Sequence, residues 1–263
     1  MAKIALVTGG SSGIGLCTAR ELLKAGCTVY EISRREYAEP GITHLSADVT
    51  DEKSVIAAVE KIKEREGRID ILINNAGFGI SGAIEFTETE DAKRQLDVNF
   101  FGMVNTVRAV LPVMRENGGG RIVNLSSVAA PIPIPFQAYY SVSKAAVNAF
   151  SMALANEVRP FGISVCAVMP GDIKTGFTGA RKKDCRGDDI YNGRISRSVA
   201  VMEHDEETGM APEAAGRFIC RAALKPKVNP LYAIGAQYKL FVFLTRILPC
   251  SIINRIIGAI YAK

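Results

Sequence analysis

Short apolar runs alternate with amphipathic stretches along the whole chain. The runs at 4–7, 27–32, 42–47, 71–73, 121–125 and 163–168, with a seventh around 232–234, have the length of buried strands. The stretch 54–66 carries apolar residues at helical spacing, and further helices are predicted at 14–25, 90–116, 140–159 and 212–224, with a kink or local adjustment at Pro112. Continuous apolar strands joined by helices indicate a parallel sheet covered on both faces. We therefore expect an α/β fold, doubly wound, forming one domain over 1–263.

Two stretches depart from this pattern. Residues 176–210 are polar and rich in glycine and charge, which is typical of a long loop that serves as a lid. Its run Arg181-Lys182-Lys183 is interpreted as a solvated part of the lid, with contact to an anionic substrate as the alternative. The extension 236–263 is apolar, but charged residues and a proline interrupt it before the ~20 residues of a membrane span are reached.

Composition narrows the classes of function. The 263 residues are 48% apolar and 22% charged, with a net charge of +5. The basic residues are scattered, which argues against a nucleic-acid partner. Six cysteines without a Cys-x-x-Cys pair, and only two histidines, argue against a metal site. Reduced thiols and the absence of a signal peptide at the N-terminus predict a cytoplasmic protein.

A glycine-rich turn joins the first predicted strand to the first predicted helix. Glycines let a backbone turn tightly and approach a pyrophosphate, whose charge is favoured at a helix N-terminus. The spacing is Gly-x-x-x-Gly-x-Gly rather than Gly-x-Gly-x-x-Gly. We predict cofactor contacts from Gly9, Ser11, Ser12, Gly13, Ile14 and Gly15.

The end of the second strand bears on the choice of dinucleotide. An acidic residue there would bind a ribose 2′-hydroxyl, whereas arginine accommodates a 2′-phosphate. The chain offers Ser33, Arg34 and Arg35, which favours NADP(H) over NAD(H). Glu31 lies two residues earlier and is expected along the strand. The alternative is that the arginines are a solvated loop pair.

Tyr140 and Lys144 are four residues apart and would share one face of a helix. Free tyrosine and lysine have pKa values near ~10 and ~10.4, so neither alone is an effective acid–base catalyst at pH 7. An ammonium beside the phenol would favour the phenolate and lower the pKa of the tyrosine. The pair is a weak signal by itself, and its weight depends on the surrounding motifs.

In order and spacing, these motifs resemble the short-chain dehydrogenase/reductase family over essentially the whole chain. The matching positions are residues 8–15, the run Asn74-Asn75-Ala76-Gly77, Asn99, Ser127, Tyr140, Lys144, Pro170-Gly171 and Thr175. The resemblance implies a Rossmann fold with seven parallel strands in the order 3-2-1-4-5-6-7. Tyr140 has Lys144 four residues on, whereas Tyr139 has Ser143 there, which favours Tyr140 as the family tyrosine. The family serine lies thirteen residues before that tyrosine, which selects Ser127 over Ser126.

The resemblance also implies roles for individual residues. Tyr140 would be the proton donor, Ser127 would stabilise the substrate oxygen, Lys144 would hold the cofactor ribose, and Asn99 would belong to a water relay. Further cofactor contacts are implied for Asp48, Val49, Asn75, Ala76, Gly77, Pro170, Gly171, Ile173 and Thr175, with Asp48 otherwise a turn residue and Thr175 otherwise a helix cap.

The substrate is less well defined by the sequence. The apolar run 131–136 before Tyr140 would wall a pocket for an apolar body. With the lid and the extension, it is similar to the family branch that acts on steroids, retinoids and lipophilic aldehydes. We expect an NADP(H)-dependent oxidoreductase that interconverts a carbonyl and an alcohol. The alternatives are a 3-oxoacyl-carrier reductase of lipid synthesis and a non-catalytic NADPH-binding regulator.

The sequence allows more than one assembly and more than one role for the extension. The family implies a homodimer or homotetramer. The extension at 236–263 is core, a subunit contact, part of the substrate site or a peripheral membrane contact.

Overall fold

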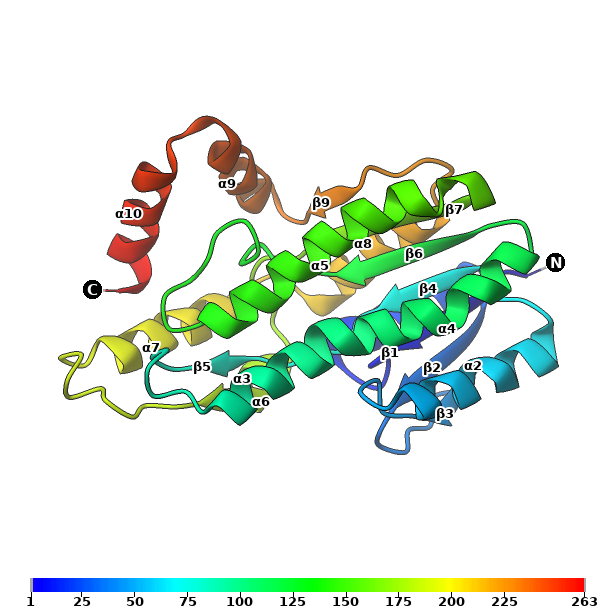
Figure 1. The fold of residues 1–263 in the computed structure, drawn as a ribbon, viewed down its shortest axis with the longest axis horizontal. Helices are drawn as coiled ribbons and strands as arrows, with labels where there is room; N and C mark the ends of the chain where they lie inside the picture. The colour runs from blue at the N-terminus through cyan, green and yellow to red at the C-terminus, as the bar shows by residue number, and fades with distance from the viewer. Residues whose placement is uncertain (1, 263) are drawn as a thin grey trace.

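The computed structural model describes residues 2–262, and a seven-stranded parallel sheet forms its centre (Figure 1). The strand order is β3-β2-β1-β4-β6-β7-β9, which, counted within this sheet, is the predicted order 3-2-1-4-5-6-7. A separate parallel pair joins β5 to β8. The strands are β1 (Ile4–Thr8), β2 (Thr28–Ser33), β3 (Ile42–Ser46), β4 (Ile71–Asn74), β5 (Ile80–Ser81), β6 (Gly120–Leu125), β7 (Ile163–Met169), β8 (Lys182–Lys183) and β9 (Leu231–Ala233).

Helices cover both faces of the sheet (Figure 1). Successive residues of a strand point to opposite faces, so Leu6 joins the core beneath α2, α4 and α5, whereas Val7 joins the core beneath α1 and α8. The helices are α1 (Gly13–Lys24), α2 (Glu52–Glu66), α3 (Thr89–Leu96), α4 (Gly102–Glu116), α5 (Ala138–Glu157), α6 (Phe177–Ala180), α7 (Arg194–Glu207), α8 (Pro212–Leu224), α9 (Ala236–Ile247) and α10 (Cys250–Tyr261), with a 3₁₀ turn at Arg159–Phe161. The doubly wound α/β fold is confirmed.

The helix predicted at 90–116 is interrupted by a π-helical segment. α3 passes into this segment at Asp97–Phe101, and α4 then continues through Pro112 to Glu116. The local adjustment thus lies at Asp97–Phe101, before the proline. Such widened turns often occur at functional sites, and this one contains Asn99.

The polarity of the stretch 176–210 favours a long loop, but the structure shows helices there. It contains the short helix α6 and the 14-residue helix α7. Ile195, Ser198, Val199 and Met202 are buried at positions i, i+3, i+4 and i+7 of α7. This one-sided burial, rather than overall hydrophobicity, stabilises the helix.

The extension at 236–263 forms α9 and α10, which protrude at one end of the molecule (Figure 1). α10 packs against α7. No helix among residues 2–262 is long and apolar enough to cross a membrane.

Candidate active site

The predicted site residues gather at the carboxyl ends of four neighbouring strands. The glycine-rich turn follows β1, the run Asn75-Ala76-Gly77 follows β4, Ser127 follows β6 and Pro170 follows β7. In doubly wound sheets, ligands bind at this edge. α5 contacts both β6 and β7, and it carries Tyr140 and Lys144 to the same edge.

The turn after β1 has the backbone geometry of a phosphate cradle. Gly9 and Gly13 have φ values of 63° and 53°, which favour glycine. A Cβ on Gly15 would lie 2.3 Å from the Gly9 carbonyl oxygen, so only glycine fits there. α1 begins at Gly13 without a side-chain cap from Ser12 and without an acidic residue in its first turn. The N-terminus of α1 therefore fits the pyrophosphate of a dinucleotide.

Asn75 holds this turn in place. Its Nδ2 donates to the carbonyl oxygens of Thr8 and Gly9, each at 3.1 Å. Thr8 Oγ1 in turn accepts from the backbone N–H groups of Asn75 and Ala76, at 2.9 and 3.0 Å. The side chain of Asn75 therefore binds the turn itself in this structure, rather than standing free for a ribose.

Glu31 lies beneath the turn, inside β2, and is fully buried. A Cβ on Gly10 would lie 2.7 Å from the Cβ of Glu31, so the acid limits which residue the turn accepts. Its carboxylate contacts His44 Nδ1 and accepts from Ser33 Oγ at 3.2 Å. Glu31 thus lies along the strand, as expected, and its carboxylate is engaged by His44 of β3.

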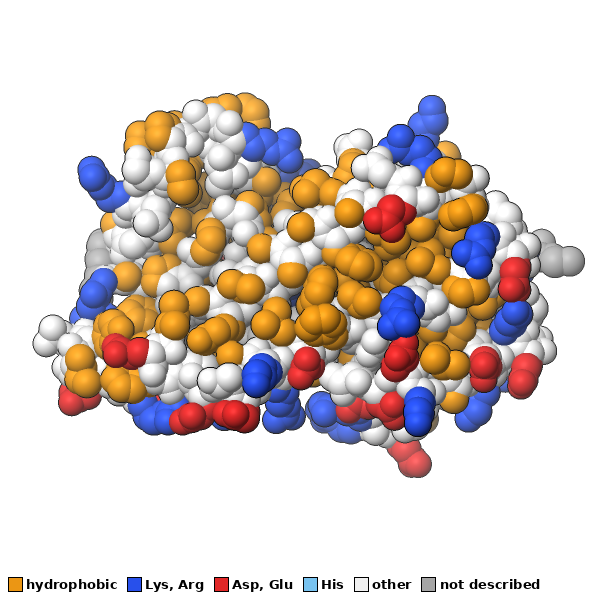
Figure 2. Space-filling view, in the orientation of Figure 1, with side chains coloured by type: hydrophobic (Ala, Val, Ile, Leu, Met, Phe, Trp, Pro, Cys, Tyr) orange, Lys and Arg blue, Asp and Glu red, His pale blue; other side chains and the backbone are white. Residues whose placement is uncertain are grey.

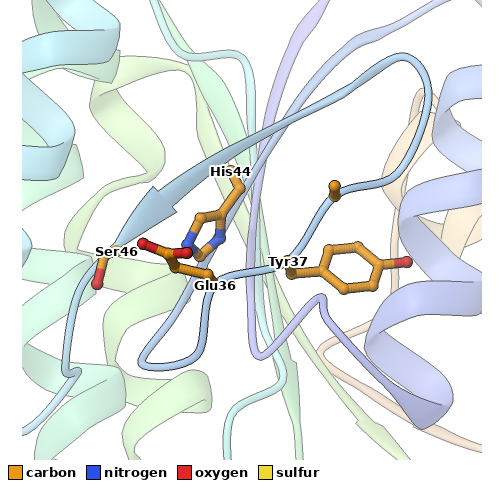
Figure 3. A pocket seen from close by; sticks show the side chains of 5 residues that line it. Glu36, Tyr37, His44 and Ser46 are labelled. Atoms are coloured by element: carbon orange, nitrogen blue, oxygen red, sulfur yellow. The ribbon is translucent and has the colours of Figure 1, made fainter.

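Arg34 and Arg35 follow β2 and are exposed, beside a hollow of about 410 Å³. Figure 3 shows its lining, with Glu36 and Tyr37 from the loop after β2 and His44 and Ser46 from β3. An anionic group at this end would meet two exposed cations.

Asp48 and Val49 border the same end of the sheet. Asp48 Oδ1 accepts from the N–H and hydroxyl of Thr50, at 2.9 and 2.8 Å, as a turn residue does. Val49 is buried, and its carbonyl oxygen accepts from Asn105 Nδ2 at 3.0 Å. Both residues have structural partners in addition to any ligand.

Ser127 and Tyr140 meet through their hydroxyl groups. Ser127 Oγ also accepts from the Ala129 N–H at 3.1 Å, which fixes its rotamer. Surrounding protein raises the pKa of Tyr140 to about 12, although the ring retains some accessible surface, and the hydrogen bond with Ser127 opposes this rise. Tyr140 therefore carries its proton at neutral pH.

Lys144 is buried beside this pair. Its Nζ donates to the Leu125 carbonyl oxygen at 2.8 Å and lies 5.7 Å from the centre of the Tyr140 ring. Burial lowers the pKa of Lys144 to about 8. The expected lowering of the tyrosine pKa by this ammonium is not seen, because burial outweighs the other influences on the phenol.

Asn99 is held by the β4–β5 connection and α5. Its Oδ1 accepts from the Phe78 N–H, and its Nδ2 donates to the Phe78 carbonyl oxygen and to Ser143 Oγ. A Cβ on Gly77 would lie 3.1 Å from Asn99 Oδ1 and 3.6 Å from Lys144 Nζ, so both side chains border Gly77. The structure brings Asn99 to the candidate site.

The segment after β7 closes the site. Pro170 accepts from the Val128 N–H at 3.0 Å, and Ile173 is buried. Thr175 Oγ1 accepts from the Phe177 N–H at 3.2 Å, just before α6, whose N-cap is Gly176. A Cβ on Gly13 would lie 3.6 Å from the methyl carbon of Thr175, so this residue also faces the glycine-rich turn.

The stretch 176–210 adds residues that the sequence did not reveal. The Phe177 ring lies 5.7 Å from that of Tyr140, and the Arg181 guanidinium lies 5.7 Å from Phe177. Arg181 is buried and paired with Glu206, whereas Lys182 and Lys183 are exposed. Arg181 is therefore not part of a solvated run. Its pairing could not be predicted, because Glu206 lies on α7, a helix that the polar composition of this stretch does not indicate.

Ser126 has a structural role, since its buried Oγ donates to the Lys144 carbonyl oxygen at 3.0 Å. Within residues 2–262, no three His, Cys, Asp or Glu residues form a group that could hold a metal ion.

The sheet, the glycine-rich turn and the Ser127–Tyr140 contact define a dinucleotide-dependent oxidoreductase. The family model for short chain dehydrogenase matches residues 3–186. The chain belongs to the short-chain dehydrogenase/reductase family, whose members act on CH–OH groups with a nicotinamide cofactor.

Three relatives give this family membership more detail. The chain is 43% identical over 241 residues to a 3-ketodihydrosphingosine reductase from Bacteroides thetaiotaomicron, covering 88% of this chain and 90% of the relative. A short-chain dehydrogenase structure from Streptomyces avermitilis is 32% identical, with a TM-score of 0.84 over 92% of this chain and 91% of the other. A 3-ketoacyl-(acyl-carrier-protein) reductase from Brucella melitensis, complexed with NADH, is 26% identical, with a TM-score of 0.75 over 88% and 96% of the two chains.

Proposed function

We propose that this protein is an NADP(H)-dependent reductase that converts a lipophilic long-chain ketone to its alcohol. A 3-oxo sphingoid base such as 3-ketodihydrosphingosine is the first substrate to consider. The observation that carries the reaction type is the hydroxyl contact of Ser127 with Tyr140, beside the buried Lys144. The substrate class is supported by the 43% identity to the 3-ketodihydrosphingosine reductase and by the apolar run at 131–136.

The chain supplies the proton and the positioning for this reaction. The dinucleotide, when bound, supplies the hydride. Tyr140, which carries its proton at neutral pH, donates this proton to the carbonyl oxygen of the substrate. Ser127 donates a hydrogen bond to the same oxygen and stabilises the negative charge that develops there. Lys144 would hold the ribose of the cofactor. Asn99 would take part in a water relay that passes protons from solvent to Lys144.

Arg34 and Arg35 support the preference for NADP(H). Both are exposed at the end of β2, whereas the nearest acid of β2, Glu31, is buried against His44. A ribose 2′-phosphate would be paired with guanidinium groups and would meet no free carboxylate of that strand. The remaining cofactor contacts are proposed for the turn at 9–15, for Asp48 and Val49, for 75–77, and for Pro170, Gly171, Ile173 and Thr175.

The organisation of the chain follows from this assignment. We infer one catalytic domain, with a lid at 176–210 and an extension at 236–263. An exposed apolar surface supports a homodimer or homotetramer (Figure 2). It includes Phe101 of the π-helical segment before α4, and Val142 and Met152 of α5. The cysteines form no disulfide within the described residues, which supports a cytoplasmic setting.

The alternative substrate is a 3-oxoacyl chain on a carrier protein. It is favoured by the likeness to the Brucella melitensis reductase, although that protein is less similar to this chain than the sphingoid-base reductase is. A regulator that binds NADPH without turnover is disfavoured by the intact set of serine, tyrosine and lysine.

Initial rates with a matched panel of ketones test the proposal. Purified protein is assayed with NADPH and NADH against 3-ketodihydrosphingosine, a 3-oxoacyl carrier thioester and a 3-oxo steroid. We expect kcat/KM to be highest for the sphingoid base and higher with NADPH than with NADH. The highest value on the carrier thioester would favour the alternative, and NADPH binding without turnover would contradict an enzyme.

A further inference from the structure

The outer faces of α9 and α10 carry two apolar stripes. Leu240, Phe243 and Ile247 follow one another at i, i+3 and i+7 on α9, with exposed fractions of 54%, 55% and 58%. Ile252, Ile256 and Ile260 follow at i, i+4 and i+8 on α10, with fractions of 45%, 47% and 46%. These spacings keep each set on one side of its helix. Isolated exposed apolar residues are ordinary, but two such stripes in succession are not.

The inner faces of the same helices are fixed to the body of the protein. Tyr238 of α9 donates to Asp172 Oδ2 at 2.5 Å, and Tyr261 of α10 donates to Asp205 Oδ2 at 3.3 Å. Arg194 Nε donates to the Ala262 carbonyl oxygen at 2.8 Å. The stripes therefore belong to an anchored surface, and their side chains remain exposed among residues 2–262.

The charge of this surface has a single sign. Lys239, Arg246 and Arg255 are exposed on the two helices, and the sequence contains no Asp or Glu after Glu213. Figure 2 shows apolar and basic side chains, without acidic ones, on the visible side of the protrusion formed by α9 and α10. A partner for this surface must accept apolar side chains and supply negative charge.

We propose that α9 and α10 form a docking surface for an anionic lipid bilayer. Amphipathic helices with basic flanks lie in the headgroup region and bury their apolar side chains at the acyl boundary. Each helix has 12 residues, about 18 Å in length, which is too short for a ~30 Å hydrocarbon core and suits an interfacial position. A second copy is a poorer occupant, because a symmetric contact would bring the three cations of one copy against those of the other.

This surface adjoins the candidate active site. The ring of Tyr238 covers Gly171, where a Cβ would lie 2.2 Å from the tyrosine Cε2, and Gly171 follows β7 at the edge that carries the site. Docking would therefore hold the site close to the lipid headgroups. The proposal concerns binding to the bilayer itself and does not depend on the identity of the substrate.

Vesicle sedimentation tests the proposal without any substrate. The full-length protein is mixed with vesicles of phosphatidylcholine alone or with phosphatidylglycerol, at low and at physiological salt. We expect binding to the phosphatidylglycerol vesicles that weakens as salt screens the charges, and little binding to phosphatidylcholine alone. No binding to phosphatidylglycerol vesicles at low salt would overturn the proposal.

Two variants separate the apolar and the electrostatic contributions. Lys239→Gln/Arg246→Gln/Arg255→Gln should lower the partition coefficient by roughly 100-fold, since each basic residue near an anionic surface contributes about fivefold. Phe243→Ser/Ile256→Ser should weaken the binding that remains at high salt, because apolar contacts carry that binding once the charges are screened.

Matched changes on α2 serve as controls for these variants. Ile56→Ser and Lys53→Gln/Lys61→Gln alter exposed residues of the same kinds on the distant helix α2 and should leave the partition coefficient unchanged. An equal loss in these controls would contradict a specific surface. Sedimentation velocity of Phe243→Ser/Ile256→Ser tests whether a second copy of the chain binds this surface instead. A smaller assembly with unchanged vesicle binding would assign the surface to a second copy and overturn the proposal.

Discussion

The hydroxyl groups of Ser127 and Tyr140 come from different parts of the chain, one from the end of β6 and the other from the first turn of α5. The tyrosine is surrounded closely enough for its pKa to rise to about 12, and the neighbouring lysine is buried enough for its pKa to fall to about 8. Because of desolvation, the Tyr140 phenol keeps its proton near neutral pH, whereas the Lys144 ammonium can release one there.

Replacement of Tyr140 tests its role as the proton donor. Tyr140→Phe keeps the ring against Phe177 but removes the proton, so we expect kcat to fall by roughly 10²–10⁴-fold. NADPH affinity, measured by fluorescence titration, should change little. Tyr139→Phe removes a hydroxyl from the adjacent position and should retain activity. Comparable turnover by Tyr140→Phe and the control would refute the assignment.

The lysine makes the reaction sensitive to pH in a defined direction. Because burial lowers the pKa of Lys144 to about 8, its ammonium is present below that pH and is lost as the pH rises through it. In the direction of carbonyl reduction, we expect kcat/KM for NADPH, which reports the free enzyme, to be level below pH 8 and to fall above it. Lys144→Met should lower activity and remove this descending limb. A wild-type profile that stays level well above pH 8 would contradict the assignment.

Among the elements, the strands and helices of the Rossmann core could be predicted, since their apolar patterns reflect burial against the sheet. The π-helical segment at Asp97–Phe101 could not, because a widened turn leaves no mark on the periodicity of a short stretch. α7 was missed because its four buried positions lie among charged residues such as Glu203 and Asp205. The pairing of Arg181 with Glu206 was missed for the same reason.

Arg121 joins β6 to the end of α8, two elements that are far apart in the sequence. From β6, its Nε donates to Ser164 Oγ at 2.8 Å, and its other nitrogens donate to the carbonyl oxygens of Ala222 and Lys225 at the end of α8. Burial lowers the pKa of Arg121, so these acceptors must offset the desolvation of its charge. The guanidinium thus closes the C-terminus of α8 against the sheet.

Loss of this connection should cost stability rather than chemistry. Arg121→Met leaves the carbonyl groups at the end of α8 without their donor, so we expect the free energy of unfolding to fall by about 3 kcal/mol in denaturant titration. Arg108→Met removes an exposed arginine paired with Glu52 and should cost less than about 1 kcal/mol. Equal losses in the two variants would show that the buried contacts of Arg121 contribute nothing beyond a surface ion pair.

At the scale of the whole molecule, one edge of the sheet carries the glycine-rich turn, the hydroxyl pair and the segment after β7. The motif spacing was sufficient to predict that these residues share an edge, because parallel strands place their carboxyl ends together. The spacing could not predict that Asn75 is engaged by the turn or that Tyr238 of α9 covers Gly171, because both depend on packing between distant segments.

Transfer of a labelled hydride tests the central claim most directly. The protein is incubated with NADPH that carries deuterium at the transferable position of the nicotinamide and with 3-ketodihydrosphingosine, and the product is analysed by mass spectrometry. We predict one deuterium on the carbinol carbon for the wild-type protein and little product for Tyr140→Phe. An alcohol without deuterium, or equal labelled product from the Tyr140→Phe variant, would contradict hydride transfer assisted by this tyrosine.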